Sequence, residues 1–426
     1  MTAVNPDFRL RDLGVSNALQ VSLLPRHRWY FIKEAFSPTL VNEAIAAEGV
    51  CEGELLLDPF AGGGTVPLTA AAAGFRSEAI EVNPFLRFLA TTKLSSARPA
   101  TLKIAGEKVL RATRRPLKSK LEGYSTFTKG NRWDRWLFPL PVIRAFEAGR
   151  RAIIDHDGPY NRLLKLALIG AAMDCCNASR DGKCLRYRPG WKRREARATD
   201  FEGRFRDRLE VIRGDLEAAP IRGDLGKVVQ GDARALMRTS STGTFRLCVT
   251  SPPYLNSFDY SDVYRPELFL GQFVRSSLML RNLRARTVRS HVQSSWPAPE
   301  RFDFGALYGE CISRFEDRDT DLWDPRLPTM IQAYFEDMQT VLSGLLRRAQ
   351  ENSAIWLVVS TSAYGGVEIP VDLILAEIAQ RVGWYLREVG VLRYLRSSSQ
   401  HVSYVDDAQR KAVPLRESVV ILHASP

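Results

Sequence analysis

The chain is poor in cysteine and histidine, the residues that most often build metal centres and disulfide frameworks. Six cysteines are spread over 426 residues without a CxxC pair, and the five histidines show no HExxH spacing. Zinc sites and redox motifs depend on such short spacings. We therefore expect neither a metal site nor a disulfide framework, a pattern typical of the reducing cytosol.

Long apolar runs are also missing. No segment reaches 18 uninterrupted apolar residues, and the first residues, MTAVNPDFRLRD, lack the apolar centre of a signal peptide. A membrane-spanning helix needs about 20 apolar residues in succession. We expect a cytoplasmic protein that does not associate with membranes.

Acidic residues are fewer than basic ones. The chain has 48 Asp and Glu against 60 Lys and Arg, a net charge of +12, while its 45% hydrophobic content is that of an ordinary globular protein. An excess of positive charge favours a polyanionic partner, most simply a nucleic acid, although solubility alone could also explain it.

A strand–helix–strand unit stands near the amino terminus. GELLLDPFAGGGTVPLTAAAAGF (53–75) has the pattern of a buried strand, a glycine turn and a helix, and SEAIEVNPF (77–85) is a second strand that ends in an acid. Such a unit is the right-handed crossover from which doubly wound parallel sheets are built. The sequence thus predicts an α/β fold.

The remaining chain alternates between helical and strand-like regions. Helical spacing dominates from 97 to 225, strands return at 227–237, 245–254 and 353–364, and a hairpin closes the chain. We predict a core made of residues 1–96, 226–280 and 341–426. Residues 97–225 form a helical insertion that is a candidate target-recognition region, and the arginine-rich residues 281–340 form a second insertion that could contact DNA.

The segment DPFAGGGT (58–65) follows the first strand and suits close approach of a ligand to the backbone. A phosphate-binding P-loop would need a lysine that is absent, and position 67 is proline where a dinucleotide fingerprint needs glycine. S-adenosylmethionine, a nucleoside derivative that carries no phosphate, is the remaining ligand, and a plain glycine turn is the alternative. The Glu81 carboxylate could accept hydrogen bonds from the ribose hydroxyls. The Asp232 carboxylate, in VVQGDARAL, could accept a hydrogen bond from the adenine amino group. A solvated acid and a helix N-cap are their alternatives.

The segment TSPPY (250–254) follows another apolar strand. Two prolines cannot continue a sheet ladder, so the chain must leave the strand in a rigid, extended form. Tyr254 could then stack on a flat base, while the Ser251 hydroxyl and the Pro252 carbonyl accept hydrogen bonds from an exocyclic amino group. Accepting these protons frees the nitrogen lone pair to attack a sulfonium methyl group. The cysteine nucleophile of carbon-5 cytosine chemistry is absent.

Together, DPFAGGGT and TSPPY closely resemble the motifs of the amino-group DNA methyltransferases, which make N4-methylcytosine or N6-methyladenine. The resemblance covers about 25–95, 226–270 and 350–424. It implies a Rossmann-like S-adenosylmethionine-dependent methyltransferase fold, with a mixed seven-stranded sheet, a carboxy-terminal hairpin and a large helical insertion. It also implies a catalytic tetrapeptide and a set of cofactor-binding residues. These are Ser251, Pro252, Pro253 and Tyr254 for catalysis, and Asp58, Phe60, Gly62, Gly64, Thr65, Glu81, Asn83 and Asp232 for S-adenosylmethionine.

The serine of SPPY favours cytosine N4 as the methyl acceptor over adenine N6. An RNA N-methyltransferase and a catalytically silent DNA-recognition subunit are further alternatives. A cognate restriction enzyme or another defence-system protein is a further candidate partner that the resemblance implies.

Double-stranded DNA is the expected partner, and the target base must be flipped out of the duplex to reach the site. Phosphate contacts need clustered Lys and Arg. The richest cluster lies in 180–197, interleaved with Tyr187 and Trp191, and a second lies in RNLRARTVRSH (281–291). Either could also be a solvated basic face. The candidate nucleic-acid-binding residues are Arg180, Lys183, Arg186, Arg188, Lys192, Arg193, Arg194, Arg286 and Arg289.

Overall fold

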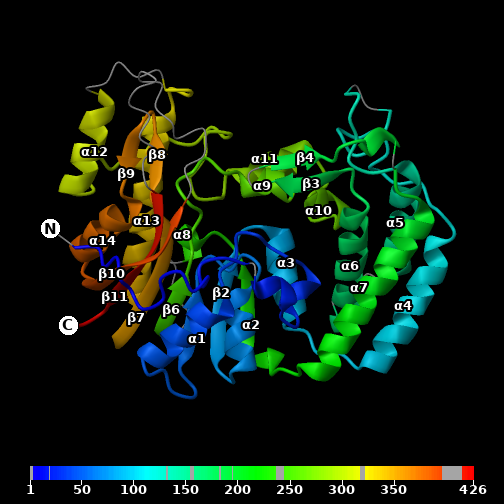
Figure 1. The fold of residues 1–426 in the computed structure, drawn as a ribbon, viewed down its shortest axis with the longest axis horizontal. Helices are drawn as coiled ribbons and strands as arrows, with labels where there is room; N and C mark the ends of the chain where they lie inside the picture. Colours follow the sequence, from blue (N-terminus) through cyan, green and yellow to red (C-terminus); the bar gives the residue numbers. More distant parts are fainter. Residues whose placement is uncertain are drawn as a thin grey trace.

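A computed structural model describes residues 3–18, 20–130, 133–153, 158–181, 184–193, 195–236, 244–316, 322–395 and 415–426. Its centre is a seven-stranded sheet in the order β10-β11-β7-β6-β1-β2-β5 (Figure 1). β11 pairs antiparallel with β10 and with β7, and the other neighbouring strands of this sheet pair in parallel. The strands are β1 (Leu55–Asp58), β2 (Arg76–Glu81), β5 (Gly226–Gln230), β6 (Phe245–Thr250), β7 (Ala349–Ser360), β10 (Tyr385–Leu395) and β11 (Leu415–His423).

This strand order confirms the predicted fold class, a Rossmann-like methyltransferase fold whose mixed sheet ends in a carboxy-terminal hairpin. Consecutive side chains of a strand point to opposite faces, and here both faces are apolar. Leu56 packs with helices on one side, and Leu57 packs with helices on the other. The helices α1 (Pro38–Ala47) and α2 (Thr65–Ala72) cover the first face, and α13 (Leu327–Arg348) and α14 (Val371–Val382) cover the second.

Local sequence signals explain where these helices begin. Ser37 caps α1 by accepting a hydrogen bond from the Thr39 amide at 3.2 Å, and Pro38 is its first residue. Gly49, with a φ of +60°, ends the turn after the helix. Asn83 caps α3 (Pro84–Lys93), again with proline in the first position. Both helices follow the preference for a polar N-cap and an early proline.

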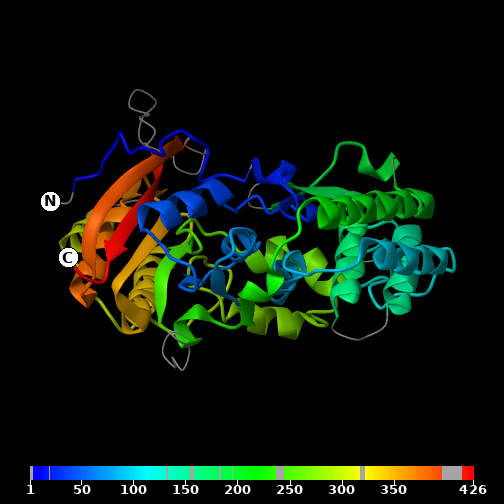
Figure 2. The same ribbon diagram turned by 90° about the horizontal axis from the view of Figure 1, so that it is seen from below.

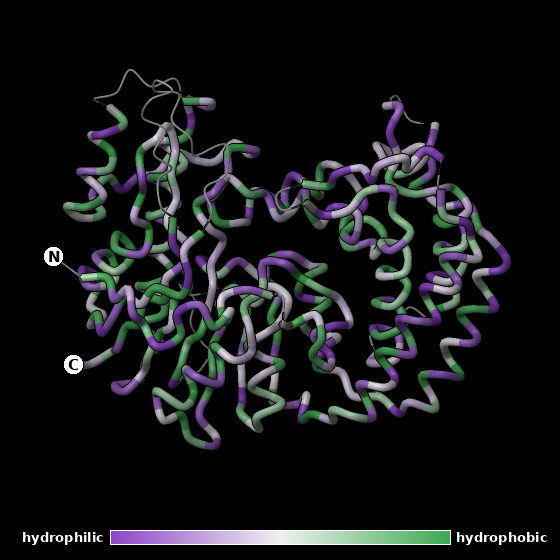
Figure 3. The backbone as a smooth tube through the Cα atoms, viewed as in Figure 1, coloured by the Kyte–Doolittle hydropathy of each residue, from purple (hydrophilic) through white to green (hydrophobic). Residues whose placement is uncertain are grey.

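The helical insertion forms an arm on the side of the molecule opposite the β10–β11 hairpin (Figures 1 and 2). Its helices alternate between hydrophobic and hydrophilic residues along their length (Figure 3), as expected for helices with one buried face. The apolar core of the arm continues into the sheet domain through Phe85 and Leu89 of α3 and Leu268. The insertion comprises α4 (Pro99–Thr113), α5 (Leu140–Ala152), α6 (Pro159–Asp174), α7 (Ala198–Ala218) and the hairpin β3 (Ala178–Asp181) with β4 (Cys184–Tyr187).

The region from 260 to 348 connects the arm with the sheet. Its last helix, α13, runs through the predicted boundary at residue 340, because its apolar face, including Met338 and Leu342, belongs to the sheet core. The remaining α-helices and strands of the described residues are α8 (Ala233–Leu236), α9 (Tyr260–Val263), α10 (Arg265–Leu270), α11 (Ser277–Arg284), α12 (Ala306–Glu316), β8 (Ser362–Tyr364) and β9 (Val367–Ile369). Among the helices of the described residues, none is long and apolar enough to span a membrane.

Candidate functional site

A cavity of about 340 Å³ opens at the carboxyl ends of β1, β2 and β6. In α/β sheets of this kind, ligands bind in the crevice outside these strand ends. The loops after all three strands line the cavity, and so do segments from both ends of the chain. Its lining includes Glu34, Gly62, Glu81, Asp232, Ser251, Tyr254, Arg286, Arg393 and Glu417.

The glycine loop after β1 is held in a conformation that only glycine adopts easily. Gly62 and Gly64 have φ values of +49° and +79°. A Cβ atom on Gly64 would lie 2.7 Å from the Cβ of Ala90 on α3, so the loop packs directly against that helix. Behind the loop, the buried Lys93 donates a hydrogen bond to the Gly63 carbonyl at 3.0 Å. Phe60, Gly62 and Thr65 line the cavity, whereas Gly64 shapes the loop from behind.

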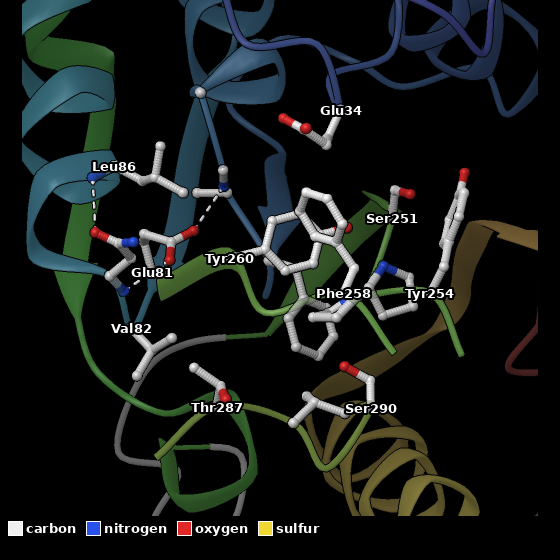
Figure 4. Close-up of a pocket in the computed structure, with 18 of the residues that line it drawn as sticks. Glu34, Glu81, Val82, Leu86, Ser251, Tyr254, Phe258, Tyr260, Thr287 and Ser290 are labelled. Carbon is white, nitrogen blue, oxygen red and sulfur yellow. Dashed lines mark hydrogen bonds between the residues drawn. The ribbon is translucent and has the colours of Figure 1, made fainter. Parts of the chain in front are cut away.

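Glu81 joins the glycine loop to the end of β2 (Figure 4). Its carboxylate accepts hydrogen bonds from the Gly62 amide at 2.7 Å and the Asn83 amide at 2.8 Å. Burial raises the pKa of Glu81 to about 7, and the negative charge of Asp58 adds to the rise. Each carboxylate oxygen has a second lone pair, so Glu81 can still accept hydrogen bonds from a ligand in the cavity.

Asp58 lies deeper than the sequence suggests. Its carboxyl group is buried, accepts hydrogen bonds from the Phe60 amide at 3.0 Å and the Thr250 hydroxyl at 2.8 Å, and is not part of the cavity wall. Burial raises the pKa of Asp58 to about 7. Asp58 therefore ties the glycine loop to the end of β6, directly before SPPY.

Asn83 and Asp232 line the cavity while serving local structure. The Asn83 side chain accepts a hydrogen bond from the Phe85 amide at 3.0 Å, as the N-cap of α3. Asp232 accepts from the Arg234 amide at 2.9 Å, and Arg234 also forms ion pairs of 2.7 Å with Asp232 and 2.8 Å with Asp337. The side chain of Asp232 is thus engaged in the turn at the start of α8 while it lines the cavity.

All four residues of SPPY line the same cavity as the glycine loop. In Figure 4, the rings of Phe258 and Tyr260 lie between Glu81 on one side and Tyr254 on the other. These two rings meet edge to face, with centroids 4.5 Å apart. Burial raises the pKa of the Tyr254 hydroxyl well above its usual value, so the ring is neutral at physiological pH.

Several cavity residues come from segments that carry no motif. Glu34 accepts a hydrogen bond from the Tyr264 hydroxyl at 2.7 Å. Arg393 and Glu417 enter from the terminal hairpin, and His291 enters from the segment after α11. Glu34 lies in the segment WYFIKEAFSPTLV (29–41), which precedes the glycine loop in the chain. Arg393, Glu417 and His291 reach the cavity through tertiary contacts that the sequence alone does not predict.

Two of the predicted nucleic-acid contacts form ion pairs within the fold. The Arg180 side chain is 19% exposed, is ion-paired with the buried Glu267, and lies 4.6 Å from the centroid of the Tyr264 ring. Arg289 is 8% exposed and pairs with Glu336 at 2.5 Å and Asp337 at 2.7 Å. Both arginines neutralise carboxylates inside the fold, and these ion pairs leave less of each guanidinium available to a phosphate.

The other predicted contacts differ in their surroundings. Arg186, Arg188 and Arg193 are exposed on and after β4. Lys192 is half-exposed beside Asp134, with its ammonium group 5.6 Å from the centroid of the Trp191 ring. Arg286 is exposed and lines the cavity. Lys183 and Arg194 lie outside the described residues.

Within the described part of the chain, no group of His, Cys, Asp or Glu side chains is placed to hold a metal ion.

Comparisons with known proteins show similarity to Type II methyltransferases. The chain is 25% identical over 397 residues to the Type II methyltransferase M.AvaI of Nostoc sp., covering 86% of this chain and 81% of the relative. It is 23% identical over 449 residues to the Type II methyltransferase M.BsoBI of Geobacillus stearothermophilus, covering 92% and 85%. No protein-family model matches the chain.

Among solved structures, the rRNA methyltransferase aviRa of Streptomyces viridochromogenes is 13% identical, with 92% of this chain and 86% of that chain covered and a TM-score of 0.29. The fold assignment rests on the strand order of the sheet and not on this overlay.

Proposed function

We propose that this chain is a site-specific DNA methyltransferase that transfers a methyl group from S-adenosylmethionine to the exocyclic amino group of a flipped base, cytosine N4. One observation carries the proposal: the glycine loop with Glu81 and the complete SPPY tetrapeptide line a single cavity. The similarity to two Type II methyltransferases over most of the chain supports DNA as the substrate.

The glycine-loop end of the cavity suits S-adenosylmethionine. Gly62 brings the backbone close to the ligand, Glu81 offers carboxylate lone pairs to the ribose hydroxyls, and Phe60 and Thr65 complete the wall. We assign cofactor binding to Phe60, Gly62, Thr65, Glu81, Asn83 and Asp232, with Asp58 and Gly64 shaping the loop. When bound, the cofactor supplies a methyl group on a positively charged sulfur.

The SPPY end of the cavity suits the acceptor base. Tyr254 offers a neutral ring for stacking, and the Ser251 hydroxyl and the Pro252 carbonyl offer acceptors for the two amino protons. These hydrogen bonds withdraw the nitrogen lone pair from the ring conjugation and leave it available as a nucleophile. No covalent enzyme intermediate is needed. Cys248 lies inside β6, and burial raises its pKa well above the usual value for a thiol.

We assign duplex DNA contacts to the exposed arginines of the insertion, Arg186, Arg188 and Arg193, with Arg286 at the cavity. The insertion would then serve as the target-recognition region. By analogy with the Type II relatives, a cognate restriction enzyme is the natural partner of such an activity.

Expression in a bacterial host that lacks DNA methylation, followed by long-read modification mapping, tests the proposal. We expect N4-methylcytosine confined to one short motif. Tyr254→Ala should lower the methylation rate roughly 10- to 100-fold through lost stacking, worth about 1–3 kcal/mol per base. Tyr385→Ala is the matched control, because Tyr385 is 50% exposed on β10 and does not line the cavity.

Other results would change the proposal. N6-methyladenine in the motif would replace cytosine by adenine as the acceptor. An unmodified genome, with a folded protein that binds S-adenosylmethionine in calorimetry, would direct the search to RNA substrates or to a missing partner subunit. Full activity of the Tyr254→Ala variant would refute the role of SPPY.

A further inference from the structure

The carboxy-terminal hairpin places an ion pair in the wall of the cavity. Arg393 on β10 stands directly opposite Glu417 on β11, and the Arg393 Nε lies 2.5 Å from the Glu417 Oε2. Both residues lie near the same edge of the sheet as SPPY, because β11 enters and β10 leaves the sheet where the parallel strands end. No sequence motif marks this pair.

A β-bulge aims the arginine at the cavity. The pairing of β10 with β11 shifts by one residue between Val391 and Arg393. Bulges reorient the side chains that follow them and are frequent beside active sites. Leu392, the extra residue, is buried and its carbonyl accepts a hydrogen bond from the Asp12 amide at 2.8 Å, so the amino-terminal segment holds the bulge in place.

The ion pair fixes one edge of the guanidinium and leaves the other edge available. Glu417, whose side chain is 5% exposed, engages only the Nε of Arg393. Within the part of the chain that the structure describes, the two terminal nitrogens of Arg393 have no hydrogen-bond partner. A guanidinium presents its donors as a rigid, planar fork that matches two adjacent acceptors.

The pair lies next to the tyrosine on which the base would stack. The charges of Arg393 and Glu417 both act on the Tyr254 hydroxyl, and Glu417 also acts on Tyr260. Consider a base that stacks on Tyr254 with its amino group at Ser251. The edge of the base next to that amino group would then lie near Arg393.

The two candidate bases differ at that edge. Next to its amino group cytosine carries two acceptors in succession, N3 and the O2 carbonyl, whereas adenine carries one acceptor, N1, followed by a C–H group. We propose that Arg393 is the residue that selects cytosine, donating from its terminal nitrogens to N3 and O2, and that Glu417 positions it. This inference rests on the proposed function and adds a residue that specifies the substrate base.

The test compares two substrates that differ only in the target base. Once mapping has given the recognition motif, kcat/KM is measured with the duplex that contains the motif and with a duplex carrying adenine at the target position. We expect Arg393→Met to lower kcat/KM for cytosine about 10- to 100-fold, the usual discrimination of a bidentate base contact, and for adenine by less than about threefold. Arg387→Met is the control, because Arg387 is exposed on the same strand and does not line the cavity.

A second variant tests the positioning role of the acid. Glu417→Gln keeps an oxygen that can accept from the Arg393 Nε but loses the charge, so we expect a smaller loss, again specific to cytosine. The affinity for S-adenosylmethionine, measured by calorimetry, should be unchanged in all three variants and shows that each one folds.

The outcomes separate this inference from the proposed function. A wild-type protein that methylates no DNA would contradict the proposed function itself. A wild-type protein that methylates cytosine, together with an Arg393→Met variant that loses activity equally on both bases, would show a phosphate contact and overturn the inference. Full cytosine activity of the variant would overturn it as well. Adenine as the natural target would refute the role of Arg393 and leave methyl transfer to DNA intact.

Discussion

At the scale of single residues, the glycine loop depends on the close approach of α3. Gly64 combines a positive φ with a contact that leaves no room for a side chain, because an added Cβ would lie 2.7 Å from the Cβ of Ala90. An L-residue with this φ is strained, and the clash adds to the strain. The loop, and with it the Gly62 amide that Glu81 binds, must shift if Gly64 changes.

Gly64→Ala should therefore weaken S-adenosylmethionine binding strongly and lower the free energy of unfolding by about 1–3 kcal/mol. Calorimetric titration and urea denaturation measure the two effects. Gly203→Ala is the control, because an added Cβ on α7 meets nothing within 4 Å; in a helix this change should be stabilising by about 0.5–1 kcal/mol. Wild-type affinity in Gly64→Ala would mean that the loop tolerates the shift.

Lys93 supports the same loop from behind, and its burial disfavours the charged form of its amino group. Burial lowers the pKa of Lys93 to about 7 in the folded protein, from 10.5 when exposed. Between these two values the unfolded chain binds more protons than the folded one, so the contribution of Lys93 to stability rises with pH over this window.

In the Lys93→Met variant, the part of the free energy of unfolding that rises with pH because of Lys93 should disappear. The measurement is the difference in the free energy of unfolding between pH 7 and pH 9.5, compared between wild type, Lys93→Met and Lys103→Met, whose lysine is exposed on α4. An equal pH dependence in wild type and Lys93→Met would show that Lys93 is neutral throughout or is solvated.

At the scale of elements, the basic run of the insertion divides into an arginine that pairs within the fold and arginines that are exposed. The β3–β4 hairpin turns Arg180 inward to Glu267, while Arg186 and Arg188 remain exposed on β4 and directly after it. Only exposed cations can neutralise phosphates, and each neutralised phosphate adds about 0.9 to the slope of log K against log salt.

Replacing Arg186, Arg188 and Arg193 together by glutamine should weaken DNA binding at all sequences and flatten the salt dependence by about 1–3 in slope. Fluorescence anisotropy over a range of salt concentrations measures both. The same replacement at Arg111, Arg114 and Arg115, exposed near the end of α4, removes equal charge elsewhere in the arm. Equal effects of the two triple variants would mean that net charge, and not the hairpin, attracts DNA.

At the scale of the whole molecule, the arm and the sheet domain share one core. The apolar cluster of the arm includes Phe85 and Leu89 of α3, which follows β2 directly. Asp215 on α7 adds a polar connection, because its buried carboxylate accepts hydrogen bonds from the Arg26 amide at 2.8 Å and the Trp29 indole at 2.9 Å. The segment that contains these two residues continues into the cavity wall at Glu34.

We therefore expect the chain to unfold in one transition, with circular dichroism and tryptophan fluorescence giving coincident urea curves. Asp215→Ala should lower the free energy of unfolding by about 3–5 kcal/mol, because it leaves buried donors without an acceptor. Asp207→Ala, at an exposed position of the same helix, should have little effect. Two separated transitions would show that the arm is an independent domain.

The sequence by itself determined the features that depend on near neighbours in the chain. The glycine loop, the proline exit after β6, the caps of α1 and α3 and the strand–helix–strand unit follow from steric limits on a few consecutive residues, and these limits hold in any context. The fold class followed from the same signals and from the resemblance that they carry.

Only the tertiary structure decided which charged side chains are buried and which face the cavity. Arg180 and Arg186 lie in the same basic run, yet one meets Glu267 in the interior and the other reaches the surface. Arg393 and Glu417 come together through strand pairing and a bulge. The free energy of a charge depends on the partners and the solvent around it, and those partners are distant in the sequence until the chain has folded.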